Sequence, residues 1–375
     1  MKVLFIQHAA IIGGSALSLK MLLQDGIEAG WKPYLVVQNE SIRNYYRDVL
    51  PDEQMFLTPR MPTFDHHSAH VFGTTPREIA RVLYRVLLLL HLAPKLRRIA
   101  KQVQPDTIHL NSSVLIPFLP FLSGSAKRMG VHIRERVAGG WRNHLFRYLL
   151  EKYADYCVFI SPVEQKLLPA RTRETAVVYN YIKPLVSTSS EKYIPSVENR
   201  KLTLLSLGGT SRIKGIEELL TLAETFPNDI QIRIVGALNE PLQNVVPPNV
   251  DICPPTPNPL GEISKCDFLI FWTHQPHFPR PIYEAWSLKK PCIASHCMRS
   301  QDDVNEFSVI LANGDDASDL ISTVKNILEE KPDLESIRDH AFKIAQEKFG
   351  PANFIKIKHI IEINQNREQS HHANA

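Results

Sequence analysis

The 375-residue sequence has few cysteines and no long apolar run, and both shortages exclude classes of protein. Its five cysteines are odd in number and never stand in C-x-x-C spacing, which argues against a disulfide framework or a zinc site and predicts a reducing compartment. The most apolar window, residues 82–93, contains Arg85 and is too short for the roughly 20 residues that span a bilayer. Gln7 and His8 interrupt the first apolar run, so no signal peptide is expected. We therefore expect a cytoplasmic protein.

The composition is that of a globular protein, with 44% hydrophobic and 22% charged residues. The length suggests two domains of ordinary size. The net charge of +4 hides an asymmetry, because residues 1–186 hold 24 Lys and Arg against 14 Asp and Glu, whereas residues 187–375 hold 19 against 25. The basic half is expected to meet an anionic partner. An anionic membrane surface fits, and nucleic acid is not expected because no RNA or DNA motif accompanies the charge.

Apolar strands and helices alternate along both halves of the chain, which is the pattern of a parallel α/β sheet. Strands are predicted at residues 3–6, 33–38, 107–110, 130–133, 156–160, 202–207, 230–235 and 267–272. Residues 51–75 are expected to form a long loop, and residues 183–200 a linker. The sequence therefore predicts two doubly wound, Rossmann-like α/β domains.

A glycine-containing turn precedes the first helix of each half. Gly13, Gly14 and Ser15 follow the first strand, and free backbone N–H groups at a helix N-terminus attract phosphate. The alternative is a simple turn in which glycine serves a positive φ. In the second half, Arg212 and Lys214 follow a Gly-Gly pair, where cations would stabilise charge that develops on a leaving diphosphate. The alternative there is two solvated surface charges.

Glu284 is the most informative acidic residue. It is predicted to open a short helix over residues 284–288, which an apolar strand at 292–294 follows. A carboxylate at the ligand-binding edge of an open sheet can accept the paired hydroxyls of a ribose. The alternative is a helix N-terminal acid that the helix dipole stabilises.

These stretches resemble the retaining GT-B glycosyltransferases of the large bacterial family 4, and the resemblance runs along most of the chain. Residues 208–215 are similar to the family's G-R-L-x-x-x-K-G, and residues 277–295 to its E-x7-E … EA … G-x-P-V-I-A-S. The resemblance implies the GT-B fold, two Rossmann-like domains that face a cleft. The implied acceptor-side domain is residues 1–185, and the implied nucleotide-sugar domain is residues 186–350. Residues 351–375 are expected to form a helix that crosses back to the first domain, followed by a polar tail.

The resemblance also implies a role for individual residues. Donor-binding residues are implied at Gly13, Gly14, Ser15, Gly209, Arg212, Lys214, Gly236, Arg280 and Glu284. Acceptor-side residues are implied at Asn111, Ser112 and His132, and catalytic residues at Arg134, Glu135 and Lys214. For His132 the alternative is a core or edge histidine. No metal or other cofactor is expected, because Arg and Lys can hold the diphosphate and no Asp-x-Asp motif is present.

Three positions depart from the family pattern. The family's arginine falls on Gly209, and Arg212 is the candidate replacement. The family's first glutamate falls on Pro276, which leaves Gln275 or His277 to contact the sugar. Residues 295–300 contain no glycine where the family usually has a Gly-Gly loop over the phosphates, so the phosphate contact there is expected to be altered or lost.

The sequence thus predicts a retaining transferase of hexosyl type. It would move a sugar from a nucleotide-diphosphate sugar to a glycan or lipid-linked acceptor in bacterial surface polysaccharide assembly. Two alternatives stay open: a catalytically weak GT-B scaffold that binds a nucleotide sugar or partner enzyme, and a GT-B nucleotide-sugar epimerase. The basic, apolar helix predicted at residues 76–104 would hold the protein at the inner face of an anionic membrane, unless its apolar stripe faces the domain core.

Overall fold

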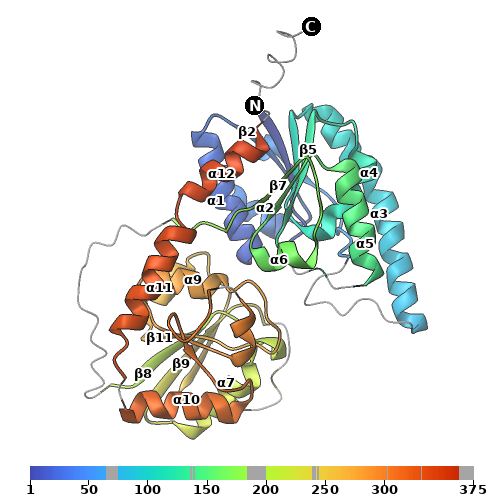
Figure 1. Cartoon of the computed structure of the whole chain (residues 1–375). Coiled ribbons are helices and arrows are strands. Elements are labelled where there is room, and N and C mark those ends of the chain that lie inside the picture. Colours follow the sequence, from blue (N-terminus) through green and yellow to red (C-terminus); the bar gives the residue numbers. More distant parts are fainter. Residues whose placement is uncertain are drawn as a thin grey trace. The chain divides into compact units, whose positions relative to one another are not determined.

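The computed structural model describes residues 1–64, 75–135, 137, 140–183, 200–238, 242, 245–301, 303–330 and 332–362. The chain divides into two compact units (Figure 1). Unit 1 is Met1–Asn180 together with the segment that begins at Ala352, and unit 2 is Tyr181–Pro351.

Unit 1 is built on a parallel sheet with the strand order β3-β2-β1-β4-β5-β6-β7. Its strands are β1 (Lys2–Ile6), β2 (Lys32–Val37), β3 (Met55–Leu57), β4 (Thr107–Leu110), β5 (Arg128–Ile133), β6 (Tyr156–Phe159) and β7 (Glu174–Val177). The strand order reverses between β1 and β4, where Val3 pairs with Thr107. Open sheets of this kind bind ligands beyond the carboxyl ends of the strands at such a switch point.

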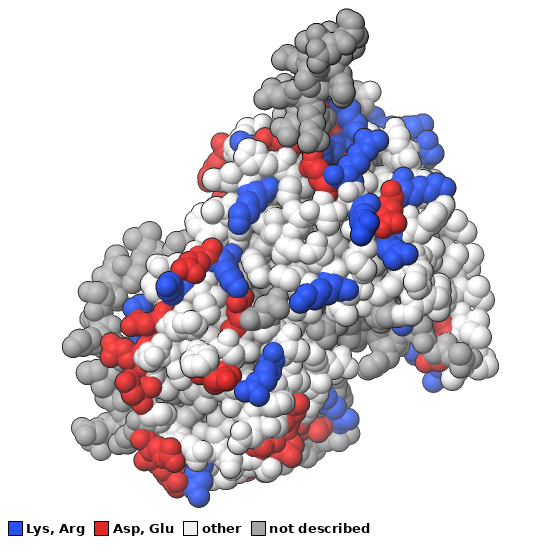
Figure 2. All heavy atoms as spheres, viewed as in Figure 1, with Lys and Arg blue, Asp and Glu red and all other residues white. Residues whose placement is uncertain are grey.

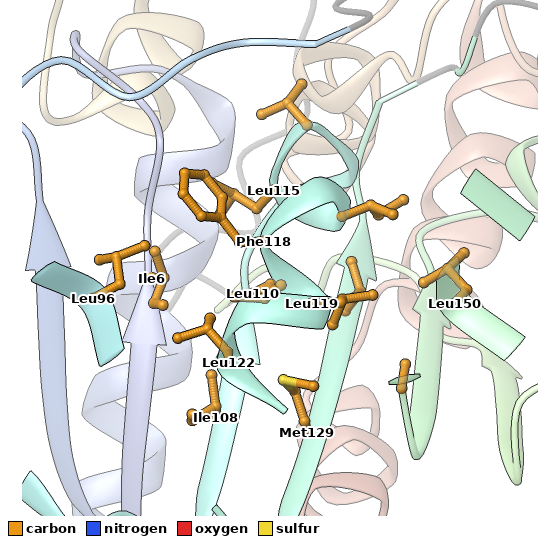
Figure 3. Close-up of a cluster of buried hydrophobic side chains, with 14 of the residues drawn as sticks. Ile6, Leu96, Ile108, Leu110, Leu115, Phe118, Leu119, Leu122, Met129 and Leu150 are labelled. Carbon is orange, nitrogen blue, oxygen red and sulfur yellow. The ribbon is translucent and has the colours of Figure 1, made fainter. Parts of the chain in front are cut away.

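Helices cover both faces of this sheet, which explains why the strands are continuous apolar runs. The helices of unit 1 are α1 (Gly14–Glu28), α2 (Glu40–Tyr46), η1 (Asp52–Gln54), α3 (Pro76–Val103), η2 (Ser113–Phe118), α4 (Leu119–Leu122), α5 (Trp141–Tyr153), α6 (Pro162–Leu167) and α12 (Ala352–Ile361). The core on the α3 side joins Ile6 and Leu110 of the sheet to Leu96 of α3 and Leu119 of α4 (Figure 3).

The helix α12 belongs to unit 1 although it follows unit 2 in the sequence. The Thr107 hydroxyl of β4 donates to the Ile361 carbonyl at 3.2 Å, and the Trp31 indole N–H donates to Glu362 at 2.9 Å. The rings of Trp31 and Phe354 also lie 6.0 Å apart. These contacts fix the end of the described chain on the first sheet.

Unit 2 repeats the architecture with the strand order β10-β9-β8-β11-β12-β13. Its strands are β8 (Leu202–Ser206), β9 (Ile230–Val235), β10 (Val250–Cys253), β11 (Phe268–Phe271), β12 (Cys292–Ala294) and β13 (Ile310–Leu311). Its helices are η3 (Arg212–Lys214), α7 (Ile216–Thr225), α8 (Pro259–Lys265), α9 (Arg280–Ser287), η4 (His296–Ser300), α10 (Ala317–Glu330) and α11 (Glu335–Lys348). Here the switch point lies between β8 and β11, so two Rossmann-like α/β units, as predicted, are confirmed.

The structure differs from the sequence-based expectation after residue 50 and at the helix that carries Glu284. The expected loop at residues 51–75 contains η1 and the edge strand β3, in which Met55 pairs with Leu35; residues 65–74 lie outside the described part. The helix that carries Glu284 begins at Arg280, four residues earlier than predicted. The linker predicted at residues 183–200 lies outside the described residues except at its two ends.

Candidate functional site

The turns after β8 and β9 approach so closely that both need glycine. Gly209 has a φ of +62°, and a Cβ there would lie 2.3 Å from the Ala237 carbonyl oxygen. Gly236 has a φ of +149°, and a Cβ there would lie 2.6 Å from the Gly209 nitrogen. Backbone packing therefore accounts for both glycines. Their contact with a donor stays a prediction.

Lys214 lies at the end of η3, close to the first of these turns. A Cβ added to Gly208 would lie 3.0 Å from Lys214 Cβ, so the lysine side chain extends along bare backbone. Lys214 is half-buried, and burial lowers the pKa of its ammonium group. Among the residues that the structure describes, no carboxylate pairs with this ammonium. A partly desolvated cation in this state would gain from an anionic ligand.

Arg212 lies on the exposed side of the same turn. Its Nε lies 3.1 Å from an oxygen of Glu217 in α7, and half of its side chain is exposed. An ion pair this exposed contributes little to stability. The proposed replacement of the family arginine by Arg212 stays a prediction.

Glu284 is held inside α9 by Arg280. The Arg280 Nε donates to Glu284 Oε1 at 2.7 Å, and only 3% of the glutamate side chain is exposed. The first turn of α9 contains no acidic residue, so the alternative that Glu284 is a helix N-terminal acid is wrong. Within the described ranges no donor contacts its second oxygen, Oε2. One carboxylate oxygen is therefore fixed by the protein, and the other can accept from a ligand.

A short helix, η4, replaces the family's glycine loop after β12. The backbone N–H of Cys297 in this helix donates to Asp315 Oδ1 at 2.8 Å. A carboxylate thus already satisfies an N–H group at the position where a phosphate contact was expected to be altered. The occupied N–H group of Cys297 is a physical reason to expect an altered phosphate contact at residues 295–300, and that alteration stays a prediction.

In unit 1, a chain of polar side chains joins the carboxyl ends of β1, β4 and β5. The amide of Asn111 donates to Gln7 Oε1 at 2.7 Å, and the Arg134 guanidinium donates to Asn111 Oδ1 at 2.8 Å and to Asn180 Oδ1 at 2.5 Å. Gln7 and Asn111 are fully buried. This row of hydrogen-bonded side chains lies at the switch point of the sheet and fixes the guanidinium of Arg134.

Glu135 is buried and bound to the start of η2. Its Oε2 accepts from the hydroxyls of Ser112 and Ser113 at 2.8 Å each, and from the Ser113 N–H at 3.0 Å. Three donors on one oxygen make this carboxylate a support for the loop after β4. The catalytic role predicted for Glu135 and the acceptor role predicted for Ser112 stay predictions.

Two buried histidines lie beneath Arg134. The Nδ1 of His132 lies 3.3 Å from Arg134 Nη2, and the Nδ1 of His109 lies 2.8 Å from the Tyr156 hydroxyl. Burial, and secondarily the charge of Arg134, lowers the pKa of both rings, that of His109 to about 3. The full burial of His132 agrees with the alternative of a core histidine, although its partner is Arg134 rather than backbone.

The glycine turn before α1 is open. Gly13 has a φ of −150°, and nothing lies within 4 Å of a Cβ added there, so the alternative of a glycine that serves a positive φ does not apply. Ser15 accepts from the buried Gln7 side chain at 3.4 Å. The phosphate contact predicted at the N-terminus of this helix stays a prediction.

Sequence reasoning missed several residues that the structure places at these edges. Gln7 directly follows β1 and Thr273 lies two residues after the end of β11, and this position at a strand end is the signal that could have identified them. Asn180, which contacts Arg134, and Asp315, which contacts Cys297, could be found only from the folded structure.

No known family model and no curated protein sequence matches the chain. Solved structures do resemble it over nearly its whole length. Anabaena HepE in complex with UDP and glucose has a TM-score of 0.71 and 16% identity, and the match covers 96% of this chain and 98% of HepE. Sucrose-phosphate synthase from Thermosynechococcus elongatus has a TM-score of 0.69 and 15% identity over 100% of both chains. WaaG, a glycosyltransferase involved in lipopolysaccharide biosynthesis, has a TM-score of 0.61 and 14% identity over 96% of this chain and 99% of WaaG.

The strand order of both sheets and these similarities agree with the resemblance found in the sequence. The chain has the GT-B fold of glycosyltransferases.

Proposed function

We propose that the protein is a retaining glycosyltransferase that uses a nucleotide-diphosphate sugar. The observation that carries the proposal is the partly desolvated Lys214 ammonium, which has no carboxylate partner among the described residues and lies beside the Gly208 backbone. HepE, which shares the fold, was solved with UDP-glucose, and this supports a nucleotide sugar as donor. The acceptor that we propose is a glycan or a lipid-linked glycan of a bacterial surface polysaccharide.

Each site residue has a proposed task in this reaction. Lys214, with Arg212 beside it, would stabilise the charge that grows on the departing diphosphate, so no metal is needed in this proposal. Glu284 would accept the ribose hydroxyls. In unit 1, Arg134 would act in catalysis, and the open turn at Gly13 would bind a donor phosphate.

Incubation with a panel of nucleotide-diphosphate sugars tests this proposal. We expect one donor to raise the melting temperature and to be hydrolysed slowly without an acceptor, and the sugar to keep its anomeric configuration on transfer. A ligand at about 100 times its dissociation constant stabilises by about 2.7 kcal/mol. Binding without hydrolysis or transfer would favour the scaffold alternative, whereas an isomeric nucleotide sugar as product would favour the epimerase.

We expect Glu284→Gln to weaken donor binding by roughly 10- to 100-fold and to leave the fold intact. The substitution removes a charge-assisted hydrogen bond of about 1.5–3 kcal/mol. Calorimetry with the donor measures the effect, and circular dichroism checks the fold because the ion pair between Arg280 and Glu284 is lost. Asp339→Asn, an exposed carboxylate that pairs with Lys289, is the matched control. Equal donor affinity in the folded variant and the parent would remove Glu284 from the site.

We also propose that unit 1 binds an anionic membrane surface through the first half of α3. None of the helices in the described ranges is long and apolar enough to cross a bilayer. Ile79, Leu83, Leu87 and Leu90 repeat at helical spacing, and between 50% and 65% of each is exposed. In the second half of α3, residues such as Leu96 are buried in the core. The apolar stripe thus faces solvent over the first half and the core over the second.

The charges near this stripe are mostly positive. The only acid in the first turns of α3 is Glu78, which Thr75 holds in a capping box. Burial and the neighbouring Arg60 and Arg81 lower the pKa of Arg85, which shows that cations crowd one another here. On the face drawn in Figure 2, acidic side chains are more frequent over unit 2 than over unit 1. An anionic surface would relieve this repulsion.

The protein is therefore expected to co-sediment with vesicles that contain phosphatidylglycerol, and binding should fall as salt rises. Each Lys or Arg near such a surface contributes about 1 kcal/mol, and the attraction decays over a Debye length of about 10 Å at about 0.1 M salt. Charge reversal at Arg81, Arg85, Arg97 and Arg98 should abolish binding. Reversal of the exposed Lys265 and Lys325 in unit 2 is the control. If the reversed protein folds and still co-sediments like the parent, a soluble acceptor becomes the better proposal.

A further inference from the structure

The turn that carries Lys214 is held by the residues that follow β11. The Ile213 carbonyl accepts from the Thr273 hydroxyl at 3.1 Å and from the His274 N–H at 2.9 Å. Thr273 is fully buried. The position of the peptide directly before Lys214 is therefore set by a strand end that comes about 60 residues later in the sequence.

The same strand end supports the turn from below. Gly215 has a φ of +71°, and a Cβ there would lie 2.6 Å from Cδ1 of Trp272. The indole is itself fixed, because its N–H donates to the Asp315 carbonyl at 3.1 Å. The turn thus packs against the buried ring of Trp272, and the hydrogen bond from Thr273 to the Ile213 carbonyl holds it in place.

Thr273 also contacts the segment in which the family's first glutamate is missing. Its Oγ1 accepts from the Gln275 N–H at 3.2 Å and lies 3.0 Å from the Gln275 carbonyl oxygen, so the one hydroxyl proton serves either that oxygen or the Ile213 carbonyl. The backbone of Thr273 is held in turn by Ser295 at the end of β12, which donates to its carbonyl at 2.9 Å. One hydroxyl therefore joins two segments that the proposed donor would contact.

We infer that Thr273 is a positioning residue for the transfer reaction, and that its hydroxyl sets Lys214 and Gln275 at the distance the donor diphosphate and sugar require. This inference rests on the proposed function. Thr273 is buried and touches no substrate, so it acts through Lys214. A lysine held by its own backbone, without a carboxylate to orient it, depends on such an anchor because a misplaced catalytic group loses its rate advantage.

Kinetics of Thr273→Val and Thr273→Ser test the inference. Valine keeps the shape and removes the hydroxyl, so it should lower kcat by roughly tenfold or more and change the donor KM less. Serine keeps the hydroxyl and should stay close to the parent. Thr221→Val, which removes a hydroxyl that donates to a carbonyl on the exposed face of α7, is the control. In a Lys214→Ala background, Thr273→Val should cost little more, because the anchor then has nothing to position.

A second measurement does not depend on activity. Labelling of Lys214 by an amine-reactive reagent, followed by mass spectrometry across pH, should show a midpoint below that of surface lysines in the parent and in Thr273→Ser. In Thr273→Val the midpoint should rise towards the surface lysines as the turn loosens and hydrates. Thr273→Ala serves in the same way if the valine variant does not fold.

The two measurements separate the possible failures. Parental kcat together with a parental labelling midpoint in Thr273→Val would overturn the inference and leave the proposed function standing. If the parent turns over no nucleotide sugar but Thr273→Val still shifts the labelling midpoint of Lys214, the proposed function is overturned. The contact by which Thr273 positions Lys214 would then stand without it.

Discussion

Lys214→Ala is expected to lower the turnover of the donor by roughly 100- to 1,000-fold and to raise the donor KM far less. A preorganised group that stabilises developing charge typically contributes that much to kcat. Since the diphosphate gains charge as it leaves, the ammonium acts mainly in the transition state, and its loss appears in kcat rather than in KM. Steady-state kinetics with the best donor of the panel provide the measurement.

The exposed Lys265, which pairs at 3.9 Å with Glu262 in the same unit, gives the matched control variant Lys265→Ala. Parental turnover in Lys214→Ala would show that Lys214 is a half-buried surface lysine without a catalytic role. The double variant with Arg212→Ala should be slower than either single variant if Arg212 replaces the arginine of the family motif. Burial lowers the pKa of Lys214, so activity should also decline at a less alkaline pH than an ordinary lysine would give.

Unit 1 is expected to lose about 2 kcal/mol of stability between pH 7 and pH 5 through the buried His109. Burial lowers the pKa of His109 from its ordinary 6.5 to about 3. Below pH 6.5 the unfolded chain therefore binds a proton that the folded chain does not, and the free energy of unfolding falls as the pH falls from 6.5 towards 3. The pKa of His132 is lowered in the same direction and for the same reason.

Hydrogen–deuterium exchange of β4 and β5 at several pH values measures this loss in unit 1 alone. His109→Gln removes the titrating group and should flatten the pH dependence, even if it lowers stability at neutral pH. The exposed His91 of α3 provides the control His91→Gln, which should leave the pH dependence unchanged. If the parent and His109→Gln lose stability equally in acid, proton binding by other groups governs the transition.

The fold predicted from the sequence is confirmed, whereas the site residues stay predictions. Strands such as β1 and β4 were found within a residue or two, because a strand covered on both faces is a continuous apolar run. The helix α5 was missed because it exposes Trp141 and alternates apolar with basic residues, so its periodicity is weak. The start of α9 was misplaced because Glu284 was taken to open the helix, whereas the helix begins at Arg280 with a proline in its first turn, where proline is favoured.

Local spacing could select candidate residues such as Arg212 and the segment at residues 295–300, but it could not show what they contact in the folded chain. That Glu217 pairs with Arg212, or that Asp315 occupies the Cys297 N–H, depends on contacts between elements far apart in the sequence. The same holds for Glu135, which the sequence predicted as catalytic and which the fold surrounds with serine donors. Motifs report which chemical groups are present, and tertiary contacts decide which of those groups are still available to a ligand.

The position of α12 sets an order of events during synthesis. The helix that completes unit 1 leaves the ribosome only after the whole of unit 2, because unit 2 ends at Pro351 and α12 begins at Ala352. Unit 2 is continuous in the nascent chain and can fold as soon as it emerges. Until then unit 1 holds Thr107 and Trp31 without the carbonyl and carboxylate that they bind in the finished protein. A nascent chain whose unit 2 has emerged while α12 is still inside the ribosome would therefore carry a finished second unit and an unfinished first one, with the surface that α12 covers open to chaperones.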